Sequence, residues 1–236
     1  LLIYGKGGFP EWGLYGAGIA TLISRVVMLI AIVAVTALLP RYREILERIK
    51  GLHWSWREGL VPLLRLGTPV ALQMGMEAAS FSVAVILVAR ISTSALAAHQ
   101  IIATISTLGF MVYYGIGAAT AIRSSTLLAQ GERRETRYVA SAGVYLCLFV
   151  AAVMMPLLVL CREPLVRLFN ADLSVAEATY LALIPLCIYQ IGDALQIVYA
   201  NALRGISRVA ILAPAAALCH LIVAPTMAWL FGFGIG

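Results

Sequence analysis

Apolar residues fill six long segments of the chain, and charged residues cluster between these segments. Each segment has at least about 20 mostly apolar residues, the length that a helix needs to cross a bilayer core of roughly 30 Å. A segment exposed to lipid must satisfy its own backbone hydrogen bonds, so we expect all six to be helical. The pattern therefore predicts an all-α, polytopic membrane helix bundle with spans at 14–39, 66–91, 95–120, 138–160, 178–203 and 209–233.

The composition agrees with a membrane protein whose partners include lipids. Apolar residues make up 62% of the chain and charged residues 12%, against roughly 45–50% and 25% in soluble proteins. Most of the 17 Lys and Arg residues lie in the connections on one predicted side. The positive-inside rule places the connection 41–65 in the cytoplasm and the first residues outside. This distribution accounts for the net charge of +6 without a nucleic-acid partner.

Two acidic residues lie inside the predicted spans. A carboxylate at the bilayer centre costs on the order of 2.5–3.5 kcal/mol, so we expect Glu77 and Asp193 to face the bundle interior or a watered cavity. Counted from Arg65 and Arg204 at the cytoplasmic helix ends, both acids lie about 16–18 Å deep at 1.5 Å per residue. Two carboxylates at one depth should share a proton or hold a metal cation such as Na⁺.

Polar residues form one stripe at helical spacing on each of three predicted spans. The alternative to a cavity is that these hydroxyls and amides join packed helices, each at roughly 0.6–2 kcal/mol. The two acids favour a cavity. We predict that its lining includes Gln73, Ser80, Gln100, Thr104, Thr107, Met111, Tyr114, Gln190, Gln196 and Asn201.

The remaining ionisable residues point to no catalytic centre. Arg25, inside the first span, is an alternative salt-bridge partner for the acids. We expect His99 to point away from the polar stripe as an interfacial or packing residue, with pH sensing as the alternative, and His220 is equally open. There is no CxxC pair, HExxH or GxSxG, so we expect neither an enzyme nor a bound cofactor.

Several segments together resemble the multidrug and toxic compound extrusion (MATE) transporters. They are LGTPVALQMGMEAASF at 66–81, SALAAHQIIATIS at 94–106, GIGAAT at 115–120 and YQIGDALQIVYANALRG at 189–205. The segment GLYGAGIATLISR, at 13–25, resembles the helix that ends the first lobe of that family.

The resemblance implies six of the twelve helices of a two-lobe transporter. Residues 1–40 would be an extracytoplasmic loop and the last helix of the first lobe, and 41–65 the cytoplasmic linker. Residues 66–236 would be the second lobe without its last helix. We accordingly expect the chain, which begins without Met, to be part of a longer protein.

The function implied is antiport across a bacterial inner membrane, in which H⁺ or Na⁺ enters and cationic amphipathic drugs leave. The full-length transporter would be a monomer. By similarity, Glu77 and Asp193 are the coupling acids and Tyr189 is an aromatic contact for the cation. Because it has both acids, the chain resembles the NorM-like bacterial branch of the family. The alternative is a lipid-linked oligosaccharide flippase, which would need a strongly cationic cavity for a pyrophosphate group.

Overall fold

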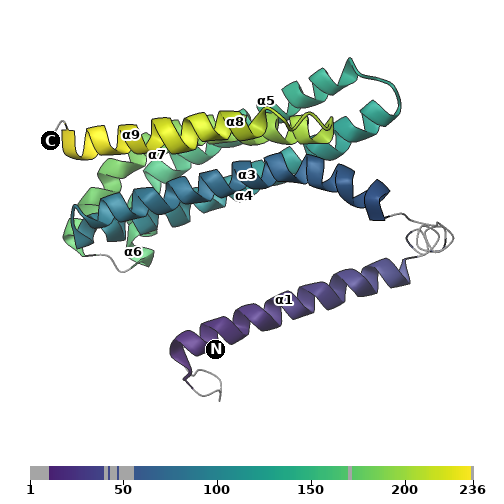
Figure 1. The fold of residues 1–236 in the computed structure, drawn as a ribbon. Helices are drawn as coiled ribbons and strands as arrows, with labels where there is room; N and C mark the ends of the chain where they lie inside the picture. The colour runs from purple at the N-terminus through teal and green to yellow at the C-terminus, as the bar shows by residue number, and fades with distance from the viewer. Residues whose placement is uncertain (1–10, 40–41, 43–46, 48–55, 170–171, 235–236) are drawn as a thin grey trace. The chain divides into compact units, whose positions relative to one another are not determined.

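The computed structural model describes residues 11–39, 42, 47, 56–169 and 172–234, which are mostly helical and contain no strand. Six helical segments in this part are long and apolar enough to cross a membrane, which confirms the predicted all-α bundle with six spans (Figure 1). Five of them are α1 (Gly13–Leu38), α3 (Trp56–Ala89), α4 (Thr93–Ala129), α5 (Glu135–Leu160) and α7 (Leu173–Gly205).

The sixth span, Leu212–Gly232, contains wide helical turns. It consists of α8 (Leu212–Ala216) and α9 (Ala224–Trp229), joined by a π-helical stretch, Ala217–Val223. Pro225 has no N–H to donate to the preceding turn, and such gaps commonly widen or bend a helix. A second π-helical stretch, Leu230–Gly234, follows α9, and the short helix α6 (Arg162–Leu168) lies between α5 and α7.

The chain divides into two units, Leu1–Gly59 and Leu60–Gly236. The boundary falls inside the segment 41–65 that is predicted to be a linker. Residues 41, 43–46 and 48–55 of that linker lie outside the described part. Residues 56–65 are helical, because α3 begins at Trp56, so at least this end of the predicted linker is helix. The assignment of the units to lobes stays a prediction.

Four helices, α3, α4, α5 and α7, begin or end outside the apolar segments that predict them. For example, α3 starts ten residues before its predicted span at 66–91, and α4 continues to Ala129 rather than ending at 120. Hydropathy detects the part of a helix that suits hydrocarbon, whereas the helix itself can continue among charged headgroups and water. At its start, α4 is capped by Ser92, whose side chain accepts a hydrogen bond from the Ala95 N–H.

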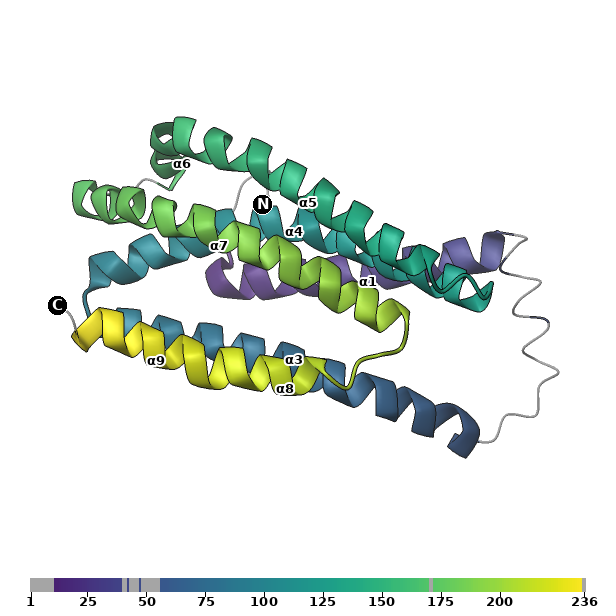
Figure 2. The same ribbon diagram turned by 90° about the horizontal axis from the view of Figure 1, so that it is seen from above.

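Three helices, α4, α5 and α7, form the core of the second unit, and α4 and α7 run parallel (Figure 2). Near their starts, the hydroxyl oxygens of Ser94 and Ser174 are 3.4 Å apart. Further along, α7 packs so closely on Gly109 and Gly117 that a Cβ atom there would lie 2.6 and 2.7 Å from its side chains. Glycines on α4 thus set the separation of the two helices.

The first half of α3 packs against the end of α7 and the residues that follow it. Val70 packs against a buried cluster formed by Ala200 at the end of α7 and by Val209 and Leu212. A side-chain hydrogen bond between Arg204 and Gln73 lies close to this cluster along both helices. From this junction onward, α3 faces α4 and α7 across a cavity.

We expect Gly205→Ala to destabilise the protein. A Cβ atom at Gly205 would lie 2.5 Å from the carbonyl oxygen and 2.9 Å from the Cα atom of Ala121, and backbone atoms cannot move aside cheaply. Overpacking of this kind typically costs about 1–3 kcal/mol. The midpoint of thermal unfolding of the purified protein in detergent should fall. Gly192→Ala on the same helix meets no atom within 4 Å and should leave the midpoint unchanged or raised; equal midpoints for both variants would contradict the packing.

Candidate functional site

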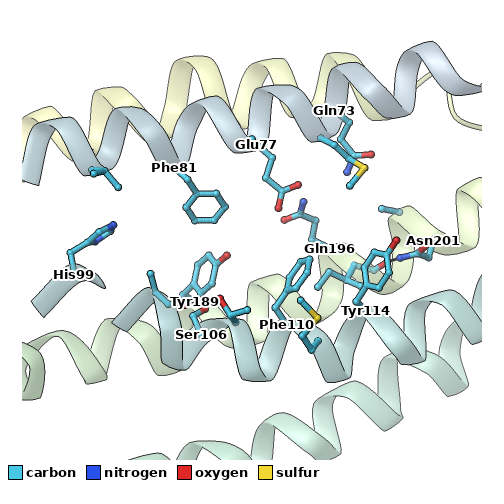
Figure 3. Close-up of a pocket in the computed structure, with 18 of the residues that line it drawn as sticks. Gln73, Glu77, Phe81, His99, Ser106, Phe110, Tyr114, Tyr189, Gln196 and Asn201 are labelled. Atoms are coloured by element: carbon cyan, nitrogen blue, oxygen red, sulfur yellow. Dashed lines mark hydrogen bonds between the residues drawn. The ribbon is translucent and has the colours of Figure 1, made fainter. Parts of the chain in front are cut away.

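A cavity of about 450 Å³ lies between α3, α4 and α7 in the second unit (Figure 3). Its wall is mainly apolar and aromatic, with amide, hydroxyl and charged groups at intervals. This combination is typical of small-molecule sites. The lining residues are Gln73, Met74, Glu77, Ala78, Phe81, Val85, His99, Gln100, Ala103, Ser106, Thr107, Phe110, Met111, Tyr114, Tyr189, Gln196, Ile197, Ala200, Asn201 and Arg204.

Glu77 is the carboxylate in the cavity wall. It projects from the middle of α3 and points across the cavity toward Gln196 of α7 (Figure 3). Its side chain is half-buried. The carboxylate thus faces open space inside the bundle, which is where a charged group in a membrane helix is least costly.

Asp193 lies behind the wall rather than in it. Its side chain is 3% exposed, and it is not among the residues that line the cavity. Its neighbours one turn away on α7, Tyr189 and Gln196, do line the cavity. Glu77 thus faces the cavity and Asp193 the bundle interior, the two kinds of location expected for these acids, and their role in coupling stays a prediction.

The two acids nevertheless belong to one electrostatic site. The Asp193 carboxyl group interacts electrostatically with Glu77 of α3 and with Tyr189 on its own helix. Its Oδ2 atom is buried and has no hydrogen-bond partner in the described part of the chain. Unpaired buried oxygens are costly, so this atom is suited to a proton or a cation.

Most of the predicted polar stripe does line the cavity. The predicted residues found in its wall are Gln73, Gln100, Thr107, Met111, Tyr114, Gln196 and Asn201, together with Glu77 and Tyr189. Their roles in binding stay predictions.

Three predicted lining residues lie elsewhere. Gln190 is buried against Gly109 of α4, because the missing Cβ there leaves room for its amide. Thr104 is exposed on α4 and donates its hydroxyl to the Gln100 carbonyl. Ser80 is half-buried on α3 but is not in the wall. A helical stripe is wider than the part of it that faces a cavity.

The polar pattern also misses part of the wall. Phe81 and Phe110 line the cavity, and the Phe110 ring stacks on Tyr114 with 5.8 Å between centroids. His99 lines the cavity too, so the expectation that it points away from the polar stripe is wrong. An apolar side chain in a membrane span gives no signal that separates a cavity wall from a lipid-facing surface.

Arg204 is the other charged residue of the wall. It stands at the end of α7, and its Nη2 atom donates a 3.1 Å hydrogen bond to Oε1 of Gln73 on α3. Side chains on a helix lean toward its N-terminus, so an arginine at the end of α7 reaches back toward the cavity. The position of Arg204 in the last turn of a predicted helix is therefore the sequence signal that points to its place in the cavity wall.

The other ionisable residues stay outside this site. Arg25 is exposed on α1 in the first unit, so its predicted pairing with the acids stays a prediction. His220 is half-buried in the π-helical stretch of the sixth span. No group of three or more His, Cys, Asp or Glu side chains capable of holding a metal ion occurs among the described residues.

The sequence matches known proteins along most of its length. A family model described as MatE matches residues 69–230. The multidrug resistance protein NorM of Vibrio vulnificus strain YJ016 is 33% identical over 205 residues, which are 87% of this chain and 45% of that protein. A probable multidrug resistance protein NorM of Bradyrhizobium diazoefficiens is 32% identical over 244 residues, which cover 100% of this chain and 51% of that protein.

A third relative is the multidrug resistance protein PmpM of Pseudomonas aeruginosa, with 31% identity over 208 residues, 86% of this chain and 43% of that protein. The chain spans about half the length of the curated relatives that it matches. The family match covers more than half of the chain and includes α4, α5 and α7 in full. The chain is a multi-pass membrane protein, and it belongs to the MatE family.

Proposed function

We propose that this chain forms part of a cation-coupled antiporter that exports cationic amphipathic compounds. The observation that carries the proposal is the cavity between three helices long and apolar enough to span a membrane, with Glu77 in its wall and a second acid, Asp193, buried nearby. The names of the relatives, multidrug resistance proteins, support small-molecule export. The relatives are bacterial, which supports a place in the bacterial inner membrane.

The cavity suits a flat organic cation. Phe81, Phe110, Tyr114 and Tyr189 offer aromatic surface to its apolar part, and a ring face within about 6 Å of a cation contributes about 0.5–2 kcal/mol. Glu77 supplies the opposite charge. The ligand would therefore be held by one carboxylate and several rings, which allows many ligand shapes.

Exchange follows from competition for the same negative charge. An inward H⁺ or Na⁺ bound at Glu77 and Asp193 removes the charge that an organic cation needs, and the organic cation repels the inorganic one in turn. The buried, unpartnered Oδ2 atom of Asp193 gives the inward ion a partner that a bulky drug cannot reach. Transport then requires that the two ligands favour different conformations.

The two alternatives from the sequence have less support. A flippase for a pyrophosphate-linked lipid needs several bases in its cavity, and the described wall has one guanidinium, Arg204, opposite Glu77. An intramembrane enzyme needs a nucleophile with an activating base or a metal. Membership of the MatE family supports transport instead.

We expect Glu77→Gln and Asp193→Asn each to abolish cation-driven efflux by a full-length protein that contains this chain. Either amide keeps the shape of the side chain but can no longer take up or release a proton, and it has no negative charge to attract Na⁺. Efflux of a fluorescent cationic dye from proteoliposomes measures the loss. Imposing a pH gradient and a Na⁺ gradient separately identifies the coupling ion.

Glu163→Gln is the matched control for these variants, because Glu163 is an exposed acid on α6, away from the cavity. It should transport like the unmodified protein. Efflux at the original rate in Glu77→Gln or Asp193→Asn, under whichever gradient drives the unmodified protein, would contradict the proposal.

We further expect Phe110→Ala to weaken the binding of an aromatic cation about tenfold, since it removes ring contacts worth roughly 1–1.5 kcal/mol. Equilibrium binding of the same dye to purified protein tests this. Phe149→Ala removes an equally large ring from the exposed surface of α5 (66% exposed) and should not change the dissociation constant. Equal effects of the two variants would show that Phe110 does not contact the dye.

A further inference from the structure

The cavity carries opposite charges on two helices. Glu77 stands on α3, and Arg204 reaches into the cavity from the end of α7. Arg204 is held beside Gln73, which lies one helical turn from Glu77 along α3. Four residues correspond to about 6 Å of helix. The wall therefore presents a negative group at Glu77 and, at its Gln73 end, a positive group.

The guanidinium group of Arg204 has little compensation from the protein. It donates to the neutral amide of Gln73, and its Nε atom is buried without a hydrogen-bond partner in the described part of the chain. No carboxylate lies within ion-pairing distance of Arg204 among the residues that the structure describes. A guanidinium in such a place normally pairs with an acid or with an anionic ligand, because its desolvation is otherwise uncompensated.

Donors, rather than acceptors, predominate around Arg204. The Gln73 oxygen already accepts from Arg204, which leaves the NH₂ group of the same amide free to donate. The Asn201 NH₂ group is occupied differently, since it donates to the Ile197 carbonyl within α7. The remaining N–H groups of the guanidinium and the amide fit a planar acceptor with two oxygens. A carboxylate is such an acceptor, and it pairs well with two neighbouring N–H groups of a guanidinium.

We propose that Arg204, positioned by Gln73, binds a carboxylate of the transported compound while Glu77 takes its cation. This inference rests on the proposed function and narrows it to the ligand class. It assigns Arg204 the selection of amphipathic compounds that carry both a cation and a carboxylate. Compounds with the cation alone bind without help from Arg204.

A pair of dyes separates the two charges. The first is a xanthylium dye with a free benzoate, and the second is the methyl ester of the same dye, which keeps the cation and loses the anion. In a full-length protein containing this chain, Arg204→Gln should weaken binding of the acid dye at least about tenfold, because a charge-assisted bidentate contact is lost. Binding of the ester should stay within about twofold.

Arg204→Lys and Arg208→Gln complete the set. The lysine keeps the charge without the planar fork and should restore part of the affinity for the acid dye. Arg208 is exposed four residues further on and does not line the cavity, so Arg208→Gln should bind both dyes normally. If Arg204→Gln changed binding of both dyes together, Arg204 would serve as a counter-charge to Glu77 or as a structural residue, and the inference would be overturned.

Competition in the unmodified protein tests the same point without a variant that has to fold. Sodium benzoate should displace the acid dye and leave the ester bound, whereas displacement of both dyes or of neither overturns the inference. Binding of the ester by the unmodified protein reports on the proposed function itself. Loss of ester binding would reject that function, and normal ester binding with no effect of Arg204→Gln on the acid dye would reject only the carboxylate site.

Discussion

The close parallel packing of α4 on α7 is the contact on which the rest of the second unit depends. Glycines at 109 and 117 let the side chains of α7 approach the α4 backbone. That approach buries Gln190 and Asn201, and Asp193 is buried on the same helix. The cavity walls adjoin this contact, since Ile197 and Asn201 of α7 lie against Gly117 and also line the cavity. Packing between two helices thus decides which polar groups are open to a ligand.

The charges in the cavity are explained by the cost of placing them in a membrane. Neither Glu77, inside α3, nor Arg204, in the last turn of α7, has an ionic partner in the described part of the chain. A folded protein keeps such groups where a ligand, an ion or water can compensate them. Asp193 is buried more deeply, and its electrostatic interaction with Glu77 means that a cation bound by one acid changes the affinity of the other.

The sequence predicts the fold more completely than the site, and the difference has physical causes. Long apolar segments identify helices in a membrane almost independently of their neighbours, so all six spans are confirmed. Helix ends are less certain, as α3 shows by starting at Trp56 among charged residues. A periodic pattern gives the direction of a side chain around its own axis only. Whether Gln190 faces a cavity or a neighbour depends on a glycine in α4, which the sequence of α7 does not contain.

The way in which α3 is attached has a geometric consequence. It meets α7 near Val70 and Gln73, whereas Phe81 stands eight residues further along, about 12 Å at 1.5 Å per residue. Any change in the angle between the two helices about that junction displaces Phe81 more than Gln73. The aromatic end of the cavity can therefore widen for a bulky ring system while the spacing between Gln73 and Arg204 is nearly unchanged. The packed junction makes the Gln73 end of the cavity the more exacting one, whereas the Phe81 end is tied to α4 by the short turn at residues 90–92.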